Sequence, residues 1–412
     1  MTDVLGSRLT PLEIASGVVL GQVTDPVADP AHGKVADPAG NGVAAPADSA
    51  GVTRPAGRAQ KPLAALEAAV LPALQQQPCL VSFSGGLDSS LILAVAVRAA
   101  RRAGLAPPIP VTWRFTGAHR ADESAWQERI IRAVGSQSWQ ILHADDDLDL
   151  VGPVARRLAR GHGLAHPANL HLHLPIVELA AGGAMLTGAG GDQVLAGWHR
   201  PLPWRRSLRR QASLARSVLM NRPPRTDLFP WLHPEISRLV ERDYRAEIRR
   251  EPRRLGERIG WHTGRRDLAL TCSGLASIAA GHAVKLVNPL LDAGFLAALI
   301  AHAGQRPGLR RDELLAEITR GELAAVITAP RAKARFLEVF HRSPTQQFTS
   351  GWDGTGADET LVDVAALRNL WSAWPIPPGT STLVQHLWLA ADASGRAAKS
   401  PRRPTAASEE HP

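Results

Sequence analysis

Cysteine, tyrosine and long hydrophobic runs are scarce in this chain. Its 412 residues include two cysteines and one tyrosine. Cys79 and Cys272 are far apart and each lies among small or apolar residues, which predicts reduced core thiols. No apolar run reaches the roughly 18 residues that cross a bilayer, and Asp3 and Glu13 stand where a signal peptide has a basic head. We therefore expect a cytoplasmic protein with no membrane span.

Positive charge, by contrast, is abundant and local. The formal net charge is +9, yet residues 200–266 alone carry eighteen arginines against seven acidic residues. In much of this region arginines alternate with acids, which is typical of a salt-bridged helix face. One cluster lacks such acids, and we expect it to dock a peptide substrate, with no nucleic acid partner. It comprises Arg205, Arg206, Arg209 and Arg210.

The chain divides into four parts by composition. Residues 1–60 are rich in Ala, Gly, Pro and Asp, with near-repeats such as DPVADP, and are predicted to be disordered. Residues 61–200 alternate strand-like apolar runs with helical periods, which predicts an α/β fold with a doubly wound parallel sheet. Residues 201–394 are helical and Arg-rich with little strand signal, and residues 395–412 are a polar tail expected to be disordered.

The stretch CLVSFSGGLDSS, from Cys79 to Ser90, is the strongest local signal. An apolar strand breaks into a Ser-Gly-Gly turn and continues as an apolar helix. Two adjacent glycines allow turn angles closed to other residues, so successive N–H groups can face one anion, as does the helix N-terminus. Asp88 would repel a phosphate unless a magnesium ion lay between them. The alternative is an ordinary strand-to-helix turn.

A second glycine-rich stretch, LTGAGGDQVLAG, runs from Leu186 to Gly197. Its apolar strand again ends in small residues followed by an acid. A segment with so few side chains can approach a nucleotide closely. Simple turn chemistry is the alternative, since glycine-rich turns after strands are common.

Taken in this order, SGGLDSS and TGAGGD resemble the pyrophosphate loop and the second motif of the asparagine-synthetase-like ATP pyrophosphatases. The resemblance covers about residues 63–342 and implies the fold of the PP-loop, or adenine-nucleotide α-hydrolase, type. In that family, which includes asparagine synthetase, β-lactam synthetase and lasso-peptide cyclases, ATP is cleaved between its α and β phosphates. The products are an adenylated substrate and pyrophosphate.

The same resemblance implies a set of site residues and two ligands, ATP and Mg²⁺. Asp88 and Asp192 would hold the magnesium ion on the pyrophosphate. Lys333, in the segment APRAKARF, would lie over the α phosphate and stabilise charge that grows as the substrate carboxylate attacks. A solvated basic helix face is the alternative for Lys333. The expected ATP-binding residues are Phe83, Ser84, Gly85, Gly86, Leu87, Asp88, Ser89, Phe115, Thr187 and Gly188.

Three further features have structural interpretations that we favour. Asp122 and Glu123 fall where the family has acids that open a helix, and we expect N-terminal capping there. HAVKLVNPLLD resembles a family segment and is expected to form a packing turn before a helix. Four histidines could suggest zinc, but no cysteine or acid completes a ligand set, so packing roles are favoured. They are His162, His166, His171 and His173.

Departures from the family narrow the expected reaction. Ala189 stands where asparagine synthetase has an acid and β-lactam synthetase a tyrosine, and the chain's single tyrosine is Tyr244. The form G-x-G-G-D is closer to lasso-peptide cyclases. The chain opens Met1-Thr2-Asp3, so we expect neither the room nor the N-terminal cysteine for a glutaminase.

We therefore expect an adenylating amide ligase whose amine is free ammonia or belongs to the substrate. Lasso-type macrolactam formation in peptide maturation is favoured, with a carboxylate-bearing peptide as substrate and a separate maturation protein as a possible partner. One alternative is a glutamine-independent asparagine synthetase. The other is a nucleotide-binding scaffold without catalysis.

Overall fold

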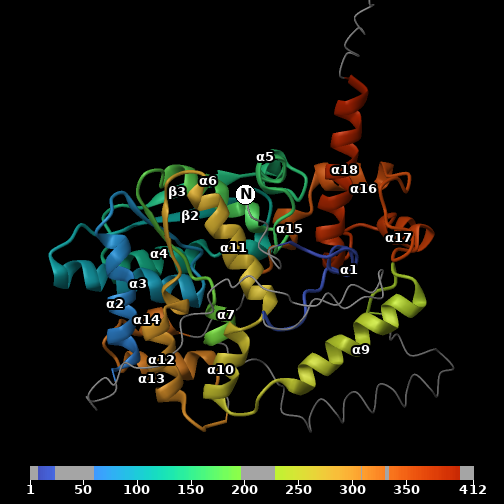
Figure 1. Cartoon of the computed structure of the whole chain (residues 1–412). Helices are drawn as coiled ribbons and strands as arrows, with labels where there is room; N and C mark the ends of the chain where they lie inside the picture. The colour runs from blue at the N-terminus through green and yellow to red at the C-terminus, as the bar shows by residue number, and fades with distance from the viewer. Residues whose placement is uncertain (1–7, 24–59, 196–227, 308, 330–333, 400–412) are drawn as a thin grey trace, which may run out of the picture.

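The structure is a computed structural model that describes residues 8–23, 60–195, 228–307, 309–329 and 334–399. A five-stranded sheet lies at the centre with helices on both faces, and a further group of helices stands to one side (Figure 1). Among the helices that the structure describes, none combines the length and apolarity that a bilayer crossing needs.

The sheet has the strand order β3-β2-β1-β4-β5, and every neighbouring pair is parallel. The predicted α/β fold with a doubly wound parallel sheet is confirmed. The central strands β1 and β4 are almost wholly buried, which explains why each appears in the sequence as a short, continuous apolar run. The strands are β1 (Cys79–Ser82), β2 (Ile109–Phe115), β3 (Gln140–Ala144), β4 (Ala184–Leu186) and β5 (Lys285–Val287).

Two hydrophobic cores lie on opposite faces of the sheet, because successive strand residues point in opposite directions. Val81 and Leu186 enter one core, whereas Leu80 and Met185 enter the other. The first core also contains buried residues of α2 (Pro62–Leu74), α3 (Leu87–Ala103), α4 (Ser124–Val134), α7 (Gly191–Val194), α10 (Leu255–Thr263), α12 (Ala293–Ala303), α13 (Arg311–Thr319) and α14 (Ala325–Thr328). The second contains residues of α5 (Pro153–His162), α6 (Leu174–Leu179), α11 (Arg266–Ala280) and α15 (Leu337–Phe340).

Two of the helices on the sheet end at a glycine. Gly104 and Gly135 adopt left-handed angles, with φ of 65° and 64°, at the ends of α3 and α4. Arg101 and Arg102 lie in the last turn of α3, where cations favour the helix dipole. These two helices flank the loop that follows β1.

The order of the strands creates a switch point between β1 and β4. From β1 the chain moves outward to β2 and β3, then returns to β4 on the other side of β1. In open parallel sheets ligands bind at the carboxyl ends of strands at such a point. The two glycine-rich stretches follow these two strands, so the fold brings them to one place.

The predicted boundary at residue 200 does not separate the sheet from the helical part. Strand β5 lies at 285–287 and pairs with β4 through the register Met185↔Leu286. Periodicity did not reveal it, since it has three residues and its first, Lys285, is exposed. The segment of the predicted packing turn thus also supplies a strand.

A third core unites the two ends of the described chain. It contains Trp231, Trp352 and Trp371 together with Ala15, which belongs to α1 (Pro11–Ser16). Trp231 donates its indole N–H to the Ala15 carbonyl over 2.7 Å. Around it lie α9 (Pro234–Arg250), α16 (Ser343–Gly351), α17 (Val364–Trp371) and α18 (Ser381–Lys399) (Figure 1).

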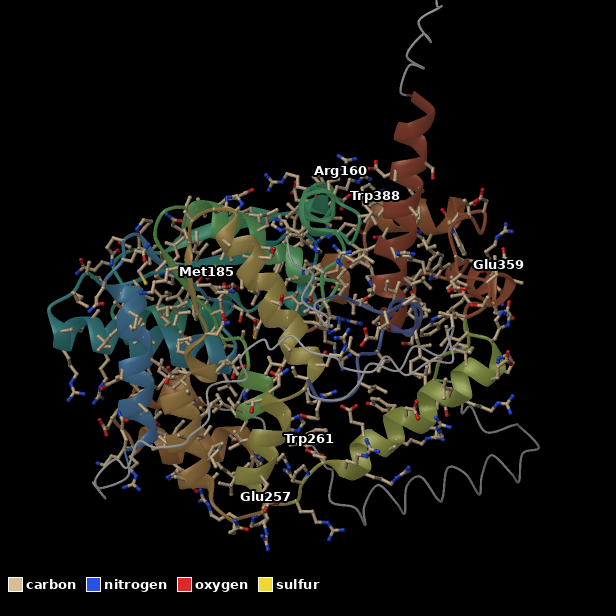
Figure 2. All side chains as sticks on the ribbon, in the orientation of Figure 1. Arg160, Met185, Glu257, Trp261, Glu359 and Trp388 are labelled. Carbon is tan, nitrogen blue, oxygen red and sulfur yellow. The ribbon has the colours of Figure 1, made fainter. Side chains whose placement is uncertain are left out.

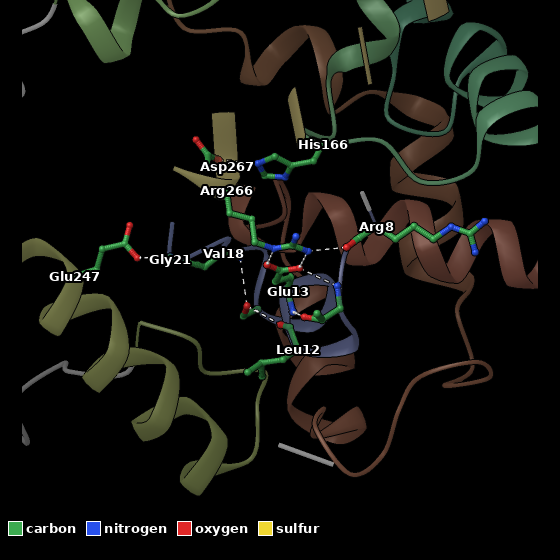
Figure 3. A network of polar contacts seen from close by, with 11 residues as sticks. Arg8, Leu12, Glu13, Val18, Gly21, His166, Glu247, Arg266 and Asp267 are labelled. Atoms are coloured by element: carbon green, nitrogen blue, oxygen red, sulfur yellow. Dashed lines mark hydrogen bonds and ion pairs between the residues drawn. The ribbon is translucent and has the colours of Figure 1, made fainter. Parts of the chain in front are cut away.

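The prediction of disorder over residues 1–60 is wrong for residues 8–23. Glu13 caps α1 and forms a two-pronged ion pair with Arg266 of α11, at 2.8 and 3.0 Å (Figure 3). Gly21 donates its N–H to Glu247 of α9 over 2.7 Å. These partners lie far along the chain, so local composition could not reveal them. Residues 24–59 lie outside the described residues.

The C-terminal helix also exceeds its prediction, because α18 runs past residue 395 to Lys399. It is fastened to the sheet domain at α5. Arg160 pairs with Asp392 at 2.8 Å and lies 5.7 Å from the centre of the Trp388 ring, and Figure 2 shows Arg160 and Trp388 where the two helices meet.

Candidate nucleotide and metal site

The loop after β1 is held in shape by its own serines. Ser84 donates its backbone N–H to the Ser89 hydroxyl over 3.2 Å, and Gly86 donates its N–H to the Ser84 hydroxyl over 3.1 Å. Gly85 has a φ of +94°, an angle that favours glycine. From α4, Gln127 donates its amide to the Ser84 carbonyl over 2.9 Å. The turn is therefore held by contacts within the protein, with the N-terminus of α3 directly behind it.

The loop after β4 is anchored on its far side by β5. Thr187 donates its backbone N–H to the Val287 carbonyl over 3.2 Å and its hydroxyl to Asn288 over 2.5 Å. The same hydroxyl accepts the N–H of Ala189 over 3.1 Å. The Thr187 side chain is thereby buried and turned away from the β1 loop.

Glycines let the two loops touch. A Cβ built on Gly188 would lie 3.2 Å from both the Asp88 Cβ and the Ser89 backbone nitrogen. A Cβ on Gly191 would overlap the Asp88 carboxyl group itself. The backbone of the loop after β4 thus packs directly against Asp88. Any side chain in place of Gly191 would force the Asp88 carboxylate to move.

Asp88 and Asp192 meet at one cation, the guanidinium of Arg311 at the start of α13. Its Nη2 contacts Asp88 Oδ1, and its Nη1 lies 2.9 Å from Asp192 Oδ1. The Arg311 side chain is 18% exposed and that of Asp192 is 51% exposed. Burial lowers the pKa of Arg311 to about 10, so it remains charged at neutral pH. The two predicted metal ligands therefore converge, although they lie in different loops.

The residues present fit a magnesium ion bound together with a nucleotide. Two carboxylates already gather around a positive charge, and a glycine-walled loop lies beside them. Within the described ranges no group of three or more His, Cys, Asp or Glu side chains could hold a metal ion. Mg²⁺ in nucleotide sites takes one or two carboxylates and completes its shell with phosphate oxygens and water.

A small pocket of about 160 Å³ opens at the end of β2. Phe115 and Trp113 line it from the strand, and Asp122, Ser124 and Gln127 line it from the start of α4. The pocket shares Gln127 with the Ser84 loop, so it continues the same edge of the sheet. Phe115, one of the expected ATP-binding residues, lines this pocket.

The segment after the predicted lysine is tied to this edge. Arg335 donates its N–H to the Arg120 carbonyl over 2.9 Å, and the Phe336 ring packs edge-on against Phe115 at 5.9 Å. Arg342 contacts Asp145 at 2.6 Å and donates to the Thr116 carbonyl just beyond β2. Lys333 itself lies outside the described residues, as does the predicted docking cluster Arg205, Arg206, Arg209 and Arg210.

Most of the other predicted ATP-binding residues lie in or beside these loops. Not all of them turn a side chain toward the site. Leu87 opens α3 beside Asp88. The Phe83 side chain is 1% exposed and belongs to the first core. Its N–H donates to the Val111 carbonyl over 2.9 Å, and its carbonyl accepts the Thr112 hydroxyl over 2.7 Å. Phe83 therefore fixes the loop to β2.

The features given structural interpretations are partly as expected, since Glu123 is the N-cap residue of α4 but makes no side-chain cap hydrogen bond. Asp122 accepts the Ser124 N–H over 2.9 Å, and this bond lowers the pKa of its carboxyl group. Asp292 caps α12 by accepting the Phe295 N–H over 2.9 Å. The four histidines have separate partners: Ser277 for His162, Asp267 for His166, the Leu148 and Ala168 carbonyls for His171, and Ser82 for His173.

Sequence reasoning missed Arg311, Gln127 and Asn288. Arg311 lies in the run PGLRRDEL, where two adjacent arginines give no sign of which one turns inward. Gln127 is an ordinary polar residue on a helix. Asn288 was the closest to a usable signal, since it lies in the segment HAVKLVNPLLD and directly follows β5.

A glycine loop on a central parallel strand, with two acids meeting it at the switch point, defines a nucleotide-binding α/β protein. The family model for asparagine synthase matches residues 63–305, more than half of the chain. The chain therefore belongs to the asparagine synthase family, whose members are ligases that use ATP, typically with Mg²⁺. A search of curated proteins finds no match. Asp88 and Asp192 lie inside the matched range and Arg311 lies beyond it.

Proposed function

We propose that this protein is an adenylating amide ligase. A substrate carboxylate oxygen bonds to the α phosphorus of ATP, the bond to the bridging oxygen breaks, and pyrophosphate leaves. An amine then attacks the carbonyl carbon of the acyl-adenylate, loses a proton, and expels AMP as the amide forms. The observation that carries the proposal is the convergence of Asp88 and Asp192 on one cation beside the Ser84 loop.

The chain's own residues would bind and orient the triphosphate. The hydroxyls of Ser84 and Ser89 and the first amides of α3 supply donors for phosphate oxygens. Asp88 and Asp192 would hold Mg²⁺, which when bound neutralises charge on the pyrophosphate. Positioning and charge stabilisation would provide most of the rate enhancement.

Lys333 would supply the cation over the α phosphate. Support comes from the residues that follow it, since Arg335, Phe336 and Arg342 are all fastened at the ends of β2 and β3. A lysine there would strengthen its contact as the α phosphorus becomes pentacoordinate and its non-bridging oxygens gain charge, which is the differential stabilisation that lowers a barrier.

For the substrate we propose a peptide that carries an acidic side chain and is closed to a lasso-type macrolactam. Support comes from Ala189, which places only a methyl group at the second motif, and from Tyr244, which lies on α9, away from the β1 and β4 loops (Figure 1). A tyrosine base of the β-lactam synthetase kind is therefore not proposed. We extend the proposal to a docking role for the Arg205 cluster and to a separate maturation protein as partner.

Exchange of labelled pyrophosphate into ATP tests the reaction. We expect exchange that depends on Mg²⁺ and on an acidic precursor peptide, with AMP accumulating once the ring closes. Exchange stimulated by aspartate and ammonia, and by no peptide, would replace the macrolactam by asparagine formation. The two outcomes differ in the carboxylate and leave adenylation in place.

A nucleotide-binding scaffold without catalysis is the second candidate. The observation in its favour is Arg311, because a cation already satisfies the two acids. Retained binding of Mg-ATP, with no AMP formed from any carboxylate or peptide, would select the scaffold over the ligase.

A further inference from the structure

Arg311 occupies the position between Asp88 and Asp192 that a shared metal ion would need. It is the first residue of α13, and its guanidinium reaches Oδ1 of Asp88 with Nη2 and Oδ1 of Asp192 with Nη1. A guanidinium is a planar fork, so it can hold two carboxylates at once where an ammonium would hold one. The pairing therefore fixes the separation of the two acids as well as their charge.

The geometry around Asp88 keeps its carboxylate aimed at this point. Gly191 packs directly against the carboxyl group, and Gly188 packs against the Asp88 Cβ. With these two walls in place, Asp88 has little room to turn toward another partner. Without a cation between them, the two carboxylates would repel each other in a site that is partly shielded from water.

The guanidinium itself is incompletely satisfied. Its Nε is buried, and within the described part of the chain it has no hydrogen-bond partner. A buried donor left in this state costs free energy, and a phosphate oxygen would satisfy it.

We propose that Arg311 is a positioning residue that takes the place of magnesium in the nucleotide-free protein, so that the guanidinium and Mg²⁺ compete for Asp88 and Asp192. The inference rests on the proposed role of these two acids as magnesium ligands. A magnesium ion needs carboxylate oxygens at about 2.0–2.1 Å, and the guanidinium contacts one such oxygen on each acid. The free metal should therefore bind weakly, and should enter together with the triphosphate, whose oxygens both complete its shell and accept the displaced arginine.

Binding of Mn²⁺ in the absence of nucleotide tests this competition. We compare the wild type with Arg311→Met, which keeps an unbranched flexible side chain and removes its charge, and follow free Mn²⁺ by electron paramagnetic resonance. We expect Arg311→Met to bind Mn²⁺ at least about tenfold more tightly than the wild type, because a competing cation and its repulsion are gone. Its melting temperature without metal should fall and should recover on adding Mn²⁺ or Mg²⁺, while that of the wild type stays constant.

Arg310→Met is the matched control. Arg310 is the neighbouring arginine, but its side chain is exposed and pairs with Asp312 at 2.9 Å, so the Mn²⁺ affinity of Arg310→Met should equal that of the wild type. Arg311→Lys keeps the charge and loses the fork, and should bind Mn²⁺ with intermediate affinity. Arg311→Lys also replaces Arg311→Met in the comparison if that variant does not fold.

Two results would overturn the inference. One is a folded Arg311→Met or Arg311→Lys protein with Mn²⁺ affinity no higher than that of the wild type. The other is a gain in affinity that survives addition of Asp192→Asn, since the ion would then lie elsewhere. Because no ATP or substrate is present, failure of pyrophosphate exchange would count against the ligase proposal and leave this result standing.

Discussion

The loops after β1 and β4 both rely on glycine, but for different physical reasons. Gly85 takes a φ of +94° that allows the first loop to turn, and hydrogen bonds to the serine hydroxyls hold that turn in place. Gly188 and Gly191 are needed in the second loop because Asp88 lies where their side chains would be. Contacts within the first loop thus fix its conformation, whereas contact with Asp88 determines which residues the second loop can contain.

The two loops therefore differ in role: the β1 loop would bind the nucleotide, and the β4 loop would align Asp192 with Asp88. The β1 loop offers hydroxyls and amides to an anion and is formed without help from β4. The β4 loop contributes one exposed acid, Asp192, whose usefulness depends on contact with the first loop. Substitutions in the first loop should therefore affect nucleotide binding and folding, and those in the second should affect the meeting of the two acids.

The largest expected effect comes from the acid that both loops share. Asp88→Asn should reduce Mg²⁺-dependent pyrophosphate exchange by about 10²–10³-fold, the usual loss when one key charge of a preorganised site is removed. Asp192→Asn should lose less, because that side chain is more exposed, at 51% against 20%. Asp363→Asn is the control, since Asp363 caps α17 in the helical part of the protein and lies outside the site. Equal activity of Asp88→Asn and the wild type would contradict the assignment.

An effect of intermediate size should distinguish the two roles of glycine in these loops. Gly191→Ala should weaken exchange strongly while the protein stays folded, because the new methyl group displaces the Asp88 carboxylate. Gly85→Ala should instead lower the free energy of unfolding, since its left-handed angle costs about 1–2 kcal/mol for other residues and its Cβ would lie 2.9 Å from Gln127.

Gly182→Ala gives the matched control for this pair. Gly182 has a φ of +75° but open space around it, so it measures the backbone cost alone. Unfolding by urea and exchange assays on all three variants would sharpen the comparison. The contrast between the loops would break down if Gly191→Ala lost stability and kept its activity.

The smallest expected effect is a pH dependence on the β1 side. His173 lies 3.4 Å from the Ser82 hydroxyl, and burial, with the nearby His171, lowers its pKa to about 4. In the unfolded chain a histidine has a pKa of about 6.5. Because His173 is harder to protonate in the folded protein, it contributes stability above that pH. This contribution should be lost as the pH falls toward 4. Urea unfolding at pH 7 and pH 5 should show a smaller decrease in stability for His173→Asn than for the wild type.

The parts of the fold that the sequence predicts are those set by local chemistry. The β1 loop, with an apolar helix after it, was expected at nearly its observed position, because glycine angles and apolar runs act over a few residues. The convergence of Asp88 and Asp192 followed from family resemblance, and the sheet order shows why it occurs.

What could not be predicted depends on distant pairing. Strand β5 has three residues and no period of its own, so only its neighbour β4 defines it as a strand. Arg311 is basic like many residues around it, and its role comes from acids on two other elements. The folded segment at residues 8–23 depends in the same way on Arg266 and Glu247.

The late position of Arg311 has a consequence for biosynthesis. It follows Asp192 by 119 residues, and β5, which anchors the second loop, also comes after a long helical stretch. At about 5–20 residues per second of translation, the first half of the protein, up to Asp192, emerges on the order of ten seconds before Arg311. During that interval the edge of β4 is without its partner strand, and this nascent species is where we expect chaperone dependence to be greatest.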